Sequence, residues 1–258
     1  MSTDVAQNNQ LEPVIQPIEI PKELVDVGLF YGRTKSKTNP KMRSYIIGNR
    51  NGVEIINVLK TLEGLEVASA FLKAKVQAGG VVLFVGTQPA AQDIVQTLAL
   101  KLGMPYVVRR WPGGSLTNFK VISKRVEYFK KLKSDLASGA LDKYTKKERG
   151  VMQHEIGRLS ELMGGLEIMT RLPDALVVID PKLHETAMRE ARRMKIPVVA
   201  FANVDADPDE IDYLVIGNNN ARKSILWFLG KIEAAIEEGS AARAALPKVE
   251  SIEPKPAI

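Results

Sequence analysis

One stretch of the chain decides the fold class: residues 175–202 have the sequence A-L-V-V-I-D-P-K-L-H-E-T-A-M-R-E-A-R-R-M-K-I-P-V-V-A-F-A. The runs at 175–179 and 197–202 are short and apolar, as is typical of strands buried on both faces of a sheet. Between them, Asp180 and Pro181 are predicted to supply the N-cap and the first-turn proline of a helix. A strand, a helix and a strand in this order make a right-handed βαβ unit with parallel strands.

The same alternation extends on both sides of this unit. Apolar residues at helical or strand spacing predict further helices over 58–78, 87–103 and 220–238, and further strands at 81–85, 105–108 and 213–216. Thr87 is the predicted cap of one helix, while Gly103 and Gly239 mark helix ends. The sequence therefore predicts an α/β fold, doubly wound, with helices on both faces of a mostly parallel sheet.

Residues 117–170 break the alternation because they contain no strand pattern. Thr145 with Glu148 has the spacing of a capping box that opens a helix. Two series of apolar residues recur at steps of three and four, and each gives a narrow seam for one partner helix: Phe119, Ile122, Val126, Phe129, Leu132 and Leu136, then Met152, Ile156, Leu159, Met163 and Leu166. We expect an antiparallel helical hairpin, a coiled coil, inserted in the α/β domain and protruding from it; packing along the sheet is the alternative.

These patterns divide the chain into four parts. Residues 1–20 are polar and contain two prolines, and they are predicted to be a flexible N-terminal arm. The α/β domain is predicted to cover 21–116 and 171–239, with the hairpin insertion at 117–170. The remaining residues, 240–258, are rich in Ala, Pro, Lys and Glu and are predicted to be a disordered tail.

Composition excludes several kinds of chemistry. The 258 residues include no cysteine, which excludes disulfides, thiolate zinc sites and cysteine nucleophiles. The two histidines, His154 and His184, are expected to be ordinary surface residues, and they leave little material for a metal site or a catalytic triad. No apolar run approaches the roughly 18 residues that span a bilayer, and no signal peptide is visible, so a cytoplasmic protein without membrane contact is expected.

The net charge of +6 is concentrated in two blocks of the chain. Residues 29–60 carry seven basic side chains against one acidic side chain, and residues 101–150 carry thirteen against four. Clustered lysine and arginine indicate a polyanion partner such as a nucleic acid. The alternative is a solvated basic surface, which explains the first block less well because its turns gain nothing from helical charge pairing.

The first block contains the segment F-Y-G-R-T-K-S-K-T-N-P-K-M-R-S-Y-I-I-G-N-R-N at 30–51. Glycine and Asn-Pro turns are expected to hold the backbone in bends from which long cationic side chains reach several phosphates, while Tyr31 or Tyr45 stacks on bases. Such phosphate contacts position a protein on RNA but do not specify sequence. The predicted RNA-binding residues of this block are Arg33, Lys35, Lys37, Lys41, Arg43 and Arg50.

The second block contains R-R-W-P-G-G-S-L-T-N-F at 109–119, between a predicted strand and a predicted helix. Its arginines can fork phosphates, and Trp111 either offers a stacking face or belongs to the core. Ser115 or Thr117 can cap the helix, whose N-terminus favours an anion. The predicted RNA-binding residues of this block are Arg109, Arg110, Trp111, Asn118, Lys120 and Lys124.

Residues at predicted strand ends suggest an alternative chemistry. Gly86 follows a strand, where nucleotide-binding folds hold pyrophosphate, but neither G-x-G-x-x-G nor G-x-x-x-x-G-K-[ST] is present. The alternative function is therefore a nucleotide-binding α/β enzyme that uses Gly86, Asp180 and Asn203, although no residue is convincingly placed as its general acid or base. Asp180, Asp205 and Asp207 could hold a divalent ion, but a helix cap and a solvated loop are the simpler interpretations.

Ordered short motifs give the chain a resemblance to a known family. They are N-P-K-M at 39–42, G-N-R-N-G at 48–52, F-V-G-T at 84–87, G-M-P-Y-V at 103–107, R-W-P-G-G-S-L-T-N-F at 110–119, R-L-P-D-A-L-V-V-I-D-P-K at 171–182, I-P-V-V-A at 196–200, D-P-D at 207–209 and G-N at 217–218. On these motifs the chain resembles the bacterial-type ribosomal protein S2 family over roughly residues 25–238. Each motif is modest, but the ordered set is specific.

The resemblance implies a flavodoxin-like α/β domain with a protruding helical hairpin. It implies a structural constituent of the small ribosomal subunit, bound to 16S-type rRNA and to neighbouring ribosomal proteins, including the large multi-domain messenger-binding one. It implies no catalysis, cofactor, metal or small-molecule substrate. The chain departs from the family at Phe30-Tyr31-Gly32-Arg33, where His-Phe-Gly-His is usual, and at Thr38, where an aromatic residue is usual. Roles of those family residues, metal contact included, are not transferred to this chain.

Overall fold

The computed structural model describes residues 22–245, except for the side chain of Asp142. The predicted N-terminal arm, 1–20, and the last part of the predicted tail, 246–258, lie outside the described residues. Among the helices of the described part, none combines the length and the apolarity that crossing a membrane requires.

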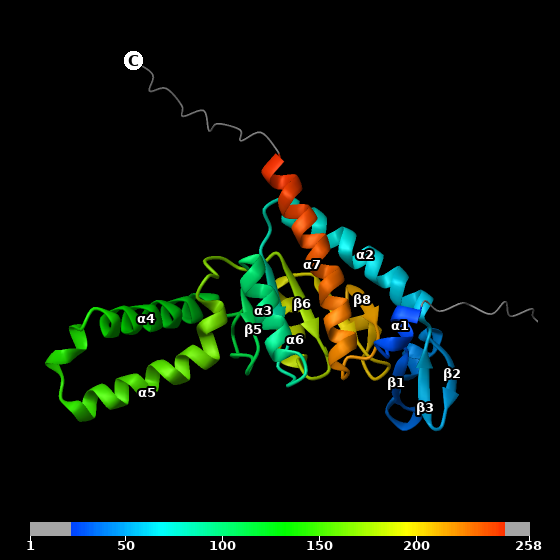
Figure 1. Ribbon diagram of the computed structural model, residues 1–258, viewed down its shortest axis with the longest axis horizontal. Helices are drawn as coiled ribbons and strands as arrows, with labels where there is room; N and C mark the ends of the chain where they lie inside the picture. Colours follow the sequence, from blue (N-terminus) through cyan, green and yellow to red (C-terminus); the bar gives the residue numbers. More distant parts are fainter. Residues whose placement is uncertain (1–21, 246–258) are drawn as a thin grey trace, which may run out of the picture.

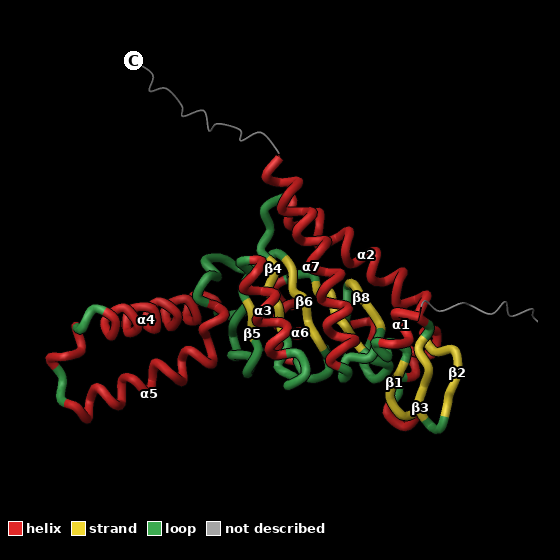
Figure 2. The backbone as a smooth tube through the Cα atoms, in the orientation of Figure 1, coloured by secondary structure: helices red, strands yellow, loops and turns green. Residues whose placement is uncertain are grey.

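The centre of the fold is a parallel sheet of five strands. They are β4 (Val82–Val85), β5 (Tyr106–Val107), β6 (Ala175–Ile179), β7 (Val198–Ala202) and β8 (Tyr213–Ile216), in the spatial order β5-β4-β6-β7-β8. In terms of the sheet's own strands this is the order 2-1-3-4-5, which is that of flavodoxin-like folds. The prediction of an α/β fold with a parallel sheet is confirmed (Figures 1 and 2).

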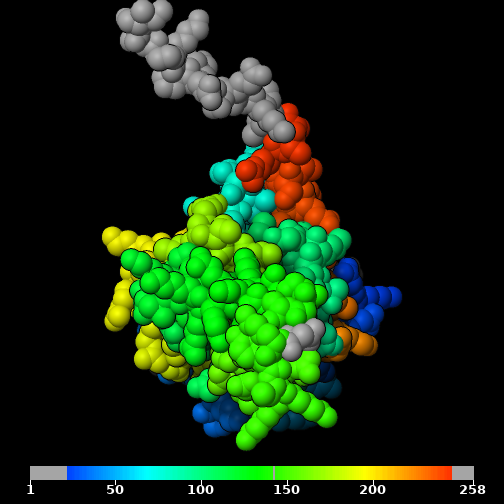
Figure 3. All heavy atoms as spheres, turned by 90° about the vertical axis from the view of Figure 1, so that its left-hand side faces the viewer, coloured from blue at the N-terminus to red at the C-terminus, as the bar shows by residue number. Residues whose placement is uncertain are grey.

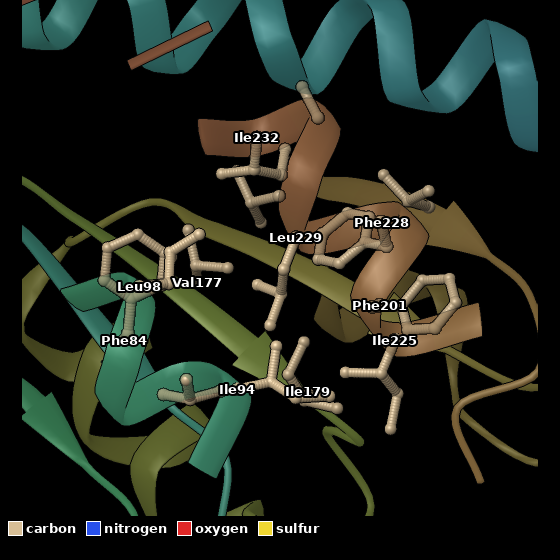
Figure 4. Close-up of a cluster of buried hydrophobic side chains, with 14 of the residues drawn as sticks. Phe84, Ile94, Leu98, Val177, Ile179, Phe201, Ile225, Phe228, Leu229 and Ile232 are labelled. Atoms are coloured by element: carbon tan, nitrogen blue, oxygen red, sulfur yellow. The ribbon is translucent and has the colours of Figure 1, made fainter. Parts of the chain in front are cut away.

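Helices cover both faces of this sheet because strand side chains alternate between the faces. Phe84, Val177 and Phe201 point toward one core, which is closed by α2 (Val58–Gln77), α3 (Gln92–Leu102) and α7 (Arg222–Ala245). The intervening strand residues, such as Leu83 and Val178, point into a second core under α6 (Glu185–Met194) and the sheet-proximal parts of α4 (Phe119–Ala137) and α5 (Lys146–Met163). In the first core the rings of Phe201 and Phe228 stack with their centroids 4.6 Å apart (Figure 4).

Helix α7 continues past the predicted end. Gly239 lies inside it, and the helix runs to Ala245, so the prediction of a disordered tail from residue 240 is wrong for 240–245. The glycine serves a close helix contact instead of a helix end: a Cβ at Gly239 would lie 2.6 Å from the carbonyl oxygen of Lys73 on α2. The two helices therefore pack at a distance that only glycine permits.

Two predicted helix caps are wrong. Helix α3 begins only at Gln92, so Thr87 is too far from its first turn to cap it. In the turn before the helix, the carbonyl of Gln88 accepts hydrogen bonds from the amides of Ala91 and Gln92. Helix α6 begins at Glu185, because Asp180 has a φ of 64° and cannot adopt the extended conformation of an N-cap. Asp180 instead turns the chain out of β6 before the helix starts.

A second, antiparallel sheet was not predicted. After α1 (Lys22–Asp26), the first basic block folds into β1 (Tyr31–Thr34), β2 (Ile46–Arg50) and β3 (Val53–Ile56), in the spatial order β1-β3-β2. Two 3-10 helices, η1 (Lys35–Lys37) and η2 (Pro40–Tyr45), connect β1 to β2. The missed signal is Asn51-Gly52, since φ is 52° and 80° at these residues, as the tight turn of a two-residue hairpin requires.

This small sheet packs on the end of the large one. Met42 and Ile56 are fully buried against Val204 and Ile216, which follow or end β7 and β8. The amide of Asn39 donates to the carbonyl of Val204 over 2.8 Å. The first basic block is therefore attached to the carboxyl ends of β7 and β8 (Figure 1).

Helices α4 and α5 lie beside each other and extend away from the sheet (Figure 1). In Figure 3, turned so that this side faces the viewer, the green atoms of residues 119–163 form the near surface. Ile122, Val126, Phe129 and Leu132 are buried on α4, whereas on α5 only Leu159 and Met163 are buried. The capping box of Thr145 and Glu148 is present. Most of the apolar packing thus lies at the sheet-proximal end of the two helices.

Gly165, in the 3-10 helix η4 (Gly164–Leu166), joins α5 to the sheet, and Gly165→Ala is expected to destabilise the fold. A Cβ there would overlap the carbonyl oxygen of Tyr106 on β5 and lie 2.6 Å from its ring carbon Cδ2. Such overpacking costs about 2 kcal/mol of the free energy of unfolding, measurable by urea denaturation. The control is Gly157→Ala on α5, where a Cβ meets nothing within 4 Å. This change should stabilise the helix slightly, and equal effects of the two variants would contradict the prediction.

Candidate nucleic-acid interface

The two basic blocks lie at opposite edges of the parallel sheet. The small sheet, β1 to β3, lies beside β8, whereas the segment 109–118 follows β5 at the other edge. With neighbouring strands about 4.8 Å apart, four strand spacings separate these edges by roughly 19 Å. The predicted RNA-binding residues therefore form two separate surfaces, on elements that lie at opposite sides of the parallel sheet in Figure 1.

Four exposed cations of the first block have no partner within the described residues. Lys35, Lys37, Arg43 and Arg50 make no ion pair and no side-chain hydrogen bond to any residue of the described range 22–245. They lie on η1, on η2 and on strand β2. We call these four residues the small-sheet surface.

Lys41, also predicted to bind RNA, is paired with two carboxylates instead. Its Nζ lies 2.9 Å from Asp207 and 2.5 Å from Asp209, across from η2. Hydrogen bonds to Asp209 and Asp207 raise the pKa of Lys41 to about 12. The same contact with Lys41 lowers the pKa of Asp207 below its ordinary value. These two ion pairs hold η2 against the loop after β7. Because Lys41 is neutralised there, it is not part of the small-sheet surface.

Arg33 is paired as well, at the C-terminal ends of the strands of the parallel sheet. Its guanidinium donates to the side-chain carbonyls of Asn219 and Asn220, over 3.2 and 3.0 Å. It also lies 3.9 Å from a carboxylate oxygen of Asp180 and 3.6 Å from one of Asp205, whose side chains are only 12% and 10% exposed. Arg33 therefore neutralises two largely buried acids. Asp205 is not part of a solvated loop, contrary to expectation.

The second block presents its cations around the start of α4. Arg109 and Arg110 are exposed after β5, and Lys120 and Lys124 are exposed on the first turns of α4. Within residues 22–245 Arg109 donates one hydrogen bond, to Gln92 over 3.3 Å. The exposed residue Asn118 stands at the N-cap, but its side chain makes no capping hydrogen bond. We call Arg109, Arg110, Asn118, Lys120 and Lys124 the β5–α4 surface.

A buried carboxylate, Glu190 of α6, organises the loop between these residues. It accepts hydrogen bonds from the indole Nε1 of Trp111 at 2.9 Å and from the amides of Gly114, Leu116 and Thr117 at 2.8, 3.0 and 3.2 Å. Burial opposes ionisation of Glu190, but these donors outweigh it, so the pKa of Glu190 is lowered. The anion expected at this helix N-terminus is therefore an internal side chain, not a phosphate.

This network changes the predicted roles of the loop residues. Trp111 is half-buried against the second core and uses its N–H internally, which supports the core interpretation of this residue. Ser115 donates its hydroxyl to the carbonyl of Pro112, and the Thr117 hydroxyl donates to Glu190, so neither caps α4. The sequence contains one signal for Glu190 that was missed, an acid on the apolar face of α6 beside Ala187 and Ala191.

The strand ends that carry the alternative enzyme site, at Gly86, Asp180 and Asn203, come together. Their polar side chains, however, already make hydrogen bonds within the protein. Asp180 accepts from Gln88 over 3.0 Å, and the side-chain oxygen of Asn203 accepts from the amide of Val204 over 2.8 Å. A Cβ on Gly86 would lie 2.9 Å from Val95 Cγ2, so this glycine serves helix packing. No group of three or more possible metal ligands is present in the part of the chain that the structure describes.

His184 is not a surface residue, contrary to expectation. It is 3% exposed, its Nε2 accepts from the amide of Thr87 over 3.2 Å, and its Nδ1 lies 2.8 Å from the carbonyl oxygen of Asp180. Burial lowers its pKa, so the ring is neutral at neutral pH and fills the place where other α/β folds bind a phosphate. His154, on α5, is exposed as predicted.

Comparison with known proteins identifies the family. Residues 24–239 match the family model described as Ribosomal protein S2. This chain belongs to the ribosomal protein S2 family. The S2 match spans the small sheet, the parallel sheet and both helices α4 and α5.

Curated relatives agree with the S2 family. The chain is 44% identical over 216 residues to the small ribosomal subunit protein uS2 of two Thermus thermophilus strains, which covers 83% of this chain and 84% of each relative. It is 41% identical over 222 residues to the uS2 protein of Geotalea uraniireducens, covering 86% of this chain and 87% of the relative.

Membership of the S2 family decides between the two functions that the sequence left open. The chain is a structural constituent of the small ribosomal subunit and not an enzyme, so its place is the small subunit in the cytoplasm. The prediction of a ribosomal structural protein is confirmed, and the alternative of a nucleotide-dependent enzyme is wrong.

Proposed function

We propose that this protein binds the 16S-type rRNA of the small subunit through two separate cationic surfaces, the small-sheet surface and the β5–α4 surface. The observation that carries the proposal is the set of exposed cations that have no acidic partner within residues 22–245, namely Lys35, Lys37, Arg43, Arg50 and Arg110. Cations that are not already neutralised can release counterions from a phosphate backbone, which is the main source of affinity for RNA.

Arg33, Lys41 and Trp111 have a different role in this proposal. Each is engaged inside the protein, with Asp205, Asp207 and Glu190 respectively. They hold the small sheet and the β5–α4 loop in place, and the free cations of the same segments make the phosphate contacts. The proposal therefore divides the twelve predicted RNA-binding residues into contact residues and supporting residues.

The finer part of the proposal is that α4 and α5 form an inserted antiparallel hairpin that reaches neighbouring components of the subunit. Apolar side chains are exposed along it, including Val121, Tyr128 and Val151, which are 52%, 47% and 63% exposed. Exposed apolar side chains on an extended element suit contact with another macromolecule. The proposed partners are neighbouring ribosomal proteins, including the large messenger-binding protein implied by the family resemblance.

The salt dependence of RNA binding tests the small-sheet surface. Each phosphate neutralised on single-stranded RNA contributes about −0.7 to the log–log salt slope, so six contacts give roughly −4. Lys37→Gln should reduce the magnitude of the slope by about 0.7. The matched control is Lys231→Gln, which removes an exposed lysine further along α7, outside both surfaces. Equal slopes for the two variants, measured by fluorescence anisotropy, would count against the surface.

Sedimentation tests the assignment to the ribosome directly. The tagged full chain, expressed in cells and separated on a sucrose gradient, is expected to migrate with small subunits. A combined variant with Lys35, Lys37, Arg43 and Arg50 all changed to Gln should shift toward the free fraction while keeping its circular dichroism spectrum. Migration of the unchanged chain only as a free protein would refute the proposed function.

A further inference from the structure

The small sheet contains a cleft that phosphate binding alone does not explain. Its volume is about 720 Å³, within the range of small-ligand sites. It lies between the η1–η2 segment and strands β2 and β3, and its lining includes Lys35, Asn39, Arg43, Asn49 and Glu54. The cleft therefore combines two cations of the small-sheet surface with a carboxylate.

Glu54 is the unusual member of this lining. It lies on β3, the central strand, on the same face as the buried Ile56 two residues later, and it is 8% exposed. No hydrogen bond or ion pair joins its carboxylate to any other residue of the described part of the chain. Although the residue as a whole is largely buried, its carboxylate oxygens are open to the cleft, where a hydrogen-bond donor can reach them. Glu54 is therefore an open acceptor at the inner side of the cleft.

The outer side of the cleft has the opposite charge. Lys35 and Arg43 are exposed, and neither lies within ion-pair distance of Glu54 or of another acid in residues 22–245. Ile46 and Ile47 add apolar surface to the lining, and Ile47 is 56% exposed. A matching ligand has hydrogen-bond donors at one end, an apolar flat body and a negative charge at the other end. A nucleotide meets all three requirements.

We propose, on the basis of the proposed RNA-binding function, that this cleft takes one unpaired guanine nucleotide of the RNA. Guanine carries two adjacent donors on its pairing edge, N1–H and the N2 amine, which match the two oxygens of the Glu54 carboxylate. Adenine and cytosine place an acceptor nitrogen beside their amine, and that acceptor would face a carboxylate oxygen. Unpaired bases in RNA are read on this edge. Lys35 and Arg43 hold the adjoining phosphate, and the isoleucines contact the base.

A cationic side chain of a neighbouring protein is the other group that could satisfy Glu54. The charges of the cleft disfavour it, because Lys35 and Arg43 stand at the same opening and would repel an incoming lysine or arginine. The same two residues attract a phosphate. The observations therefore favour the nucleotide.

The test compares single-stranded uridine decamers that carry one central guanosine, inosine or adenosine, with the full chain and fluorescence anisotropy as the readout. Guanosine is expected to bind about tenfold or more tightly than adenosine, because a bidentate contact discriminates to this degree. Inosine lacks only the N2 amine and is expected to fall between them. A native chain that binds all three equally would overturn the inference and leave the proposed RNA binding intact, whereas absence of salt-dependent binding to any of them would overturn both.

Glu54→Gln is the variant that isolates the carboxylate. Glutamine has the same shape, but its NH2 group is a donor and would face a donor of guanine instead of accepting from it. The preference for the guanosine decamer should therefore disappear, while affinity for the adenosine decamer stays the same or rises slightly. The Glu54 carboxylate has no hydrogen-bond or ion-pair partner to lose among residues 22–245, so the variant should fold as stably as the native chain. The matched control is Glu66→Gln, an exposed acid on α2 outside the cleft, which should keep the preference. A preference that survives in Glu54→Gln, or Glu54-dependent binding of oligolysine in place of RNA, would overturn the inference.

Discussion

Replacing Glu190 by alanine is expected to lower the free energy of unfolding by about 4 kcal/mol, the largest effect predicted for this protein. The variant leaves the indole N–H of Trp111 and the amides of Gly114, Leu116 and Thr117 without the acceptor that now serves all of them. Each buried donor left unsatisfied costs about 1–3 kcal/mol, reduced wherever water can reach it. Urea denaturation followed by circular dichroism measures the change.

The same helix offers a control for this prediction. Glu185→Ala removes an acid of α6 whose contact is with the exposed Arg189, one turn away on the same helix. Such surface pairs contribute little to stability, so the control should unfold almost as the native chain does. If both variants lost the same stability, Glu190 would not be the organising residue of the β5–α4 loop.

The contribution of Glu190 should also depend on pH. Its pKa in the folded protein is lowered, because the hydrogen bonds to the carboxylate outweigh the cost of burial. Stability from a lowered carboxyl pKa is fully present above the unfolded value of about 4.3 and is lost as the pH falls through the folded value. The difference in unfolding free energy between the native chain and Glu190→Ala should therefore be constant from pH 7 to pH 5 and shrink below about pH 4. A difference that grows on acidification would contradict this account.

Replacing Arg33 by methionine is expected to cost about 3 kcal/mol. Methionine keeps much of the side-chain volume but removes the charge that stands between Asp180 and Asp205, two acids that are 12% and 10% exposed. Two largely buried carboxylates then lose their shared cation. Asp180 keeps hydrogen bonds from Gln88 and from the amide of Leu183, and Asp205 keeps Lys182 at 3.7 Å. Chemical denaturation gives the value.

Lys41→Met provides the comparison for Arg33. Lys41 also bridges two acids, but its contacts are with Asp207 and Asp209 on the surface, where water screens the charges. It should change stability much less than Arg33→Met, although it removes the same charge from the same block of sequence. Similar losses for both variants would show that burial of Asp180 and Asp205 is not what makes Arg33 important.

The separate roles of Arg33 and Lys41 explain why sequence reasoning treated the first basic block as uniform. The cations in 33–50 alternate with turn residues in a regular way, and nothing in that spacing distinguishes the paired from the free ones. Their partners are remote in the chain: Asn219 and Asp207 lie 186 and 166 positions from the residues that they bind. Only the packing of the small sheet on the ends of β7 and β8 brings them together.

The small sheet itself shows how far local signals reached. Asn51-Gly52 is the strongest short hairpin signal in the chain, and it lies between two runs that became β2 and β3. The signal was missed because the flanking strands contain Arg50, Glu54 and no clear alternation of apolar and polar residues. Strand β3 is half-buried under η2, so an acid occupies an inward position that a pattern of period two would reserve for an apolar residue.

The sequence alone determined the parallel sheet, its helices on both faces and the family, because those follow from apolar periodicity, turn residues and ordered motifs that act over a few neighbouring positions. The tertiary structure alone decided which charges are available. It placed Glu190 at the start of α4, His184 beneath Thr87 and Arg33 between two acids, all through contacts between distant segments. The energy of a charge depends on its neighbours in space and on its exposure to water. Neither of these can be read from the local sequence around the charged residue.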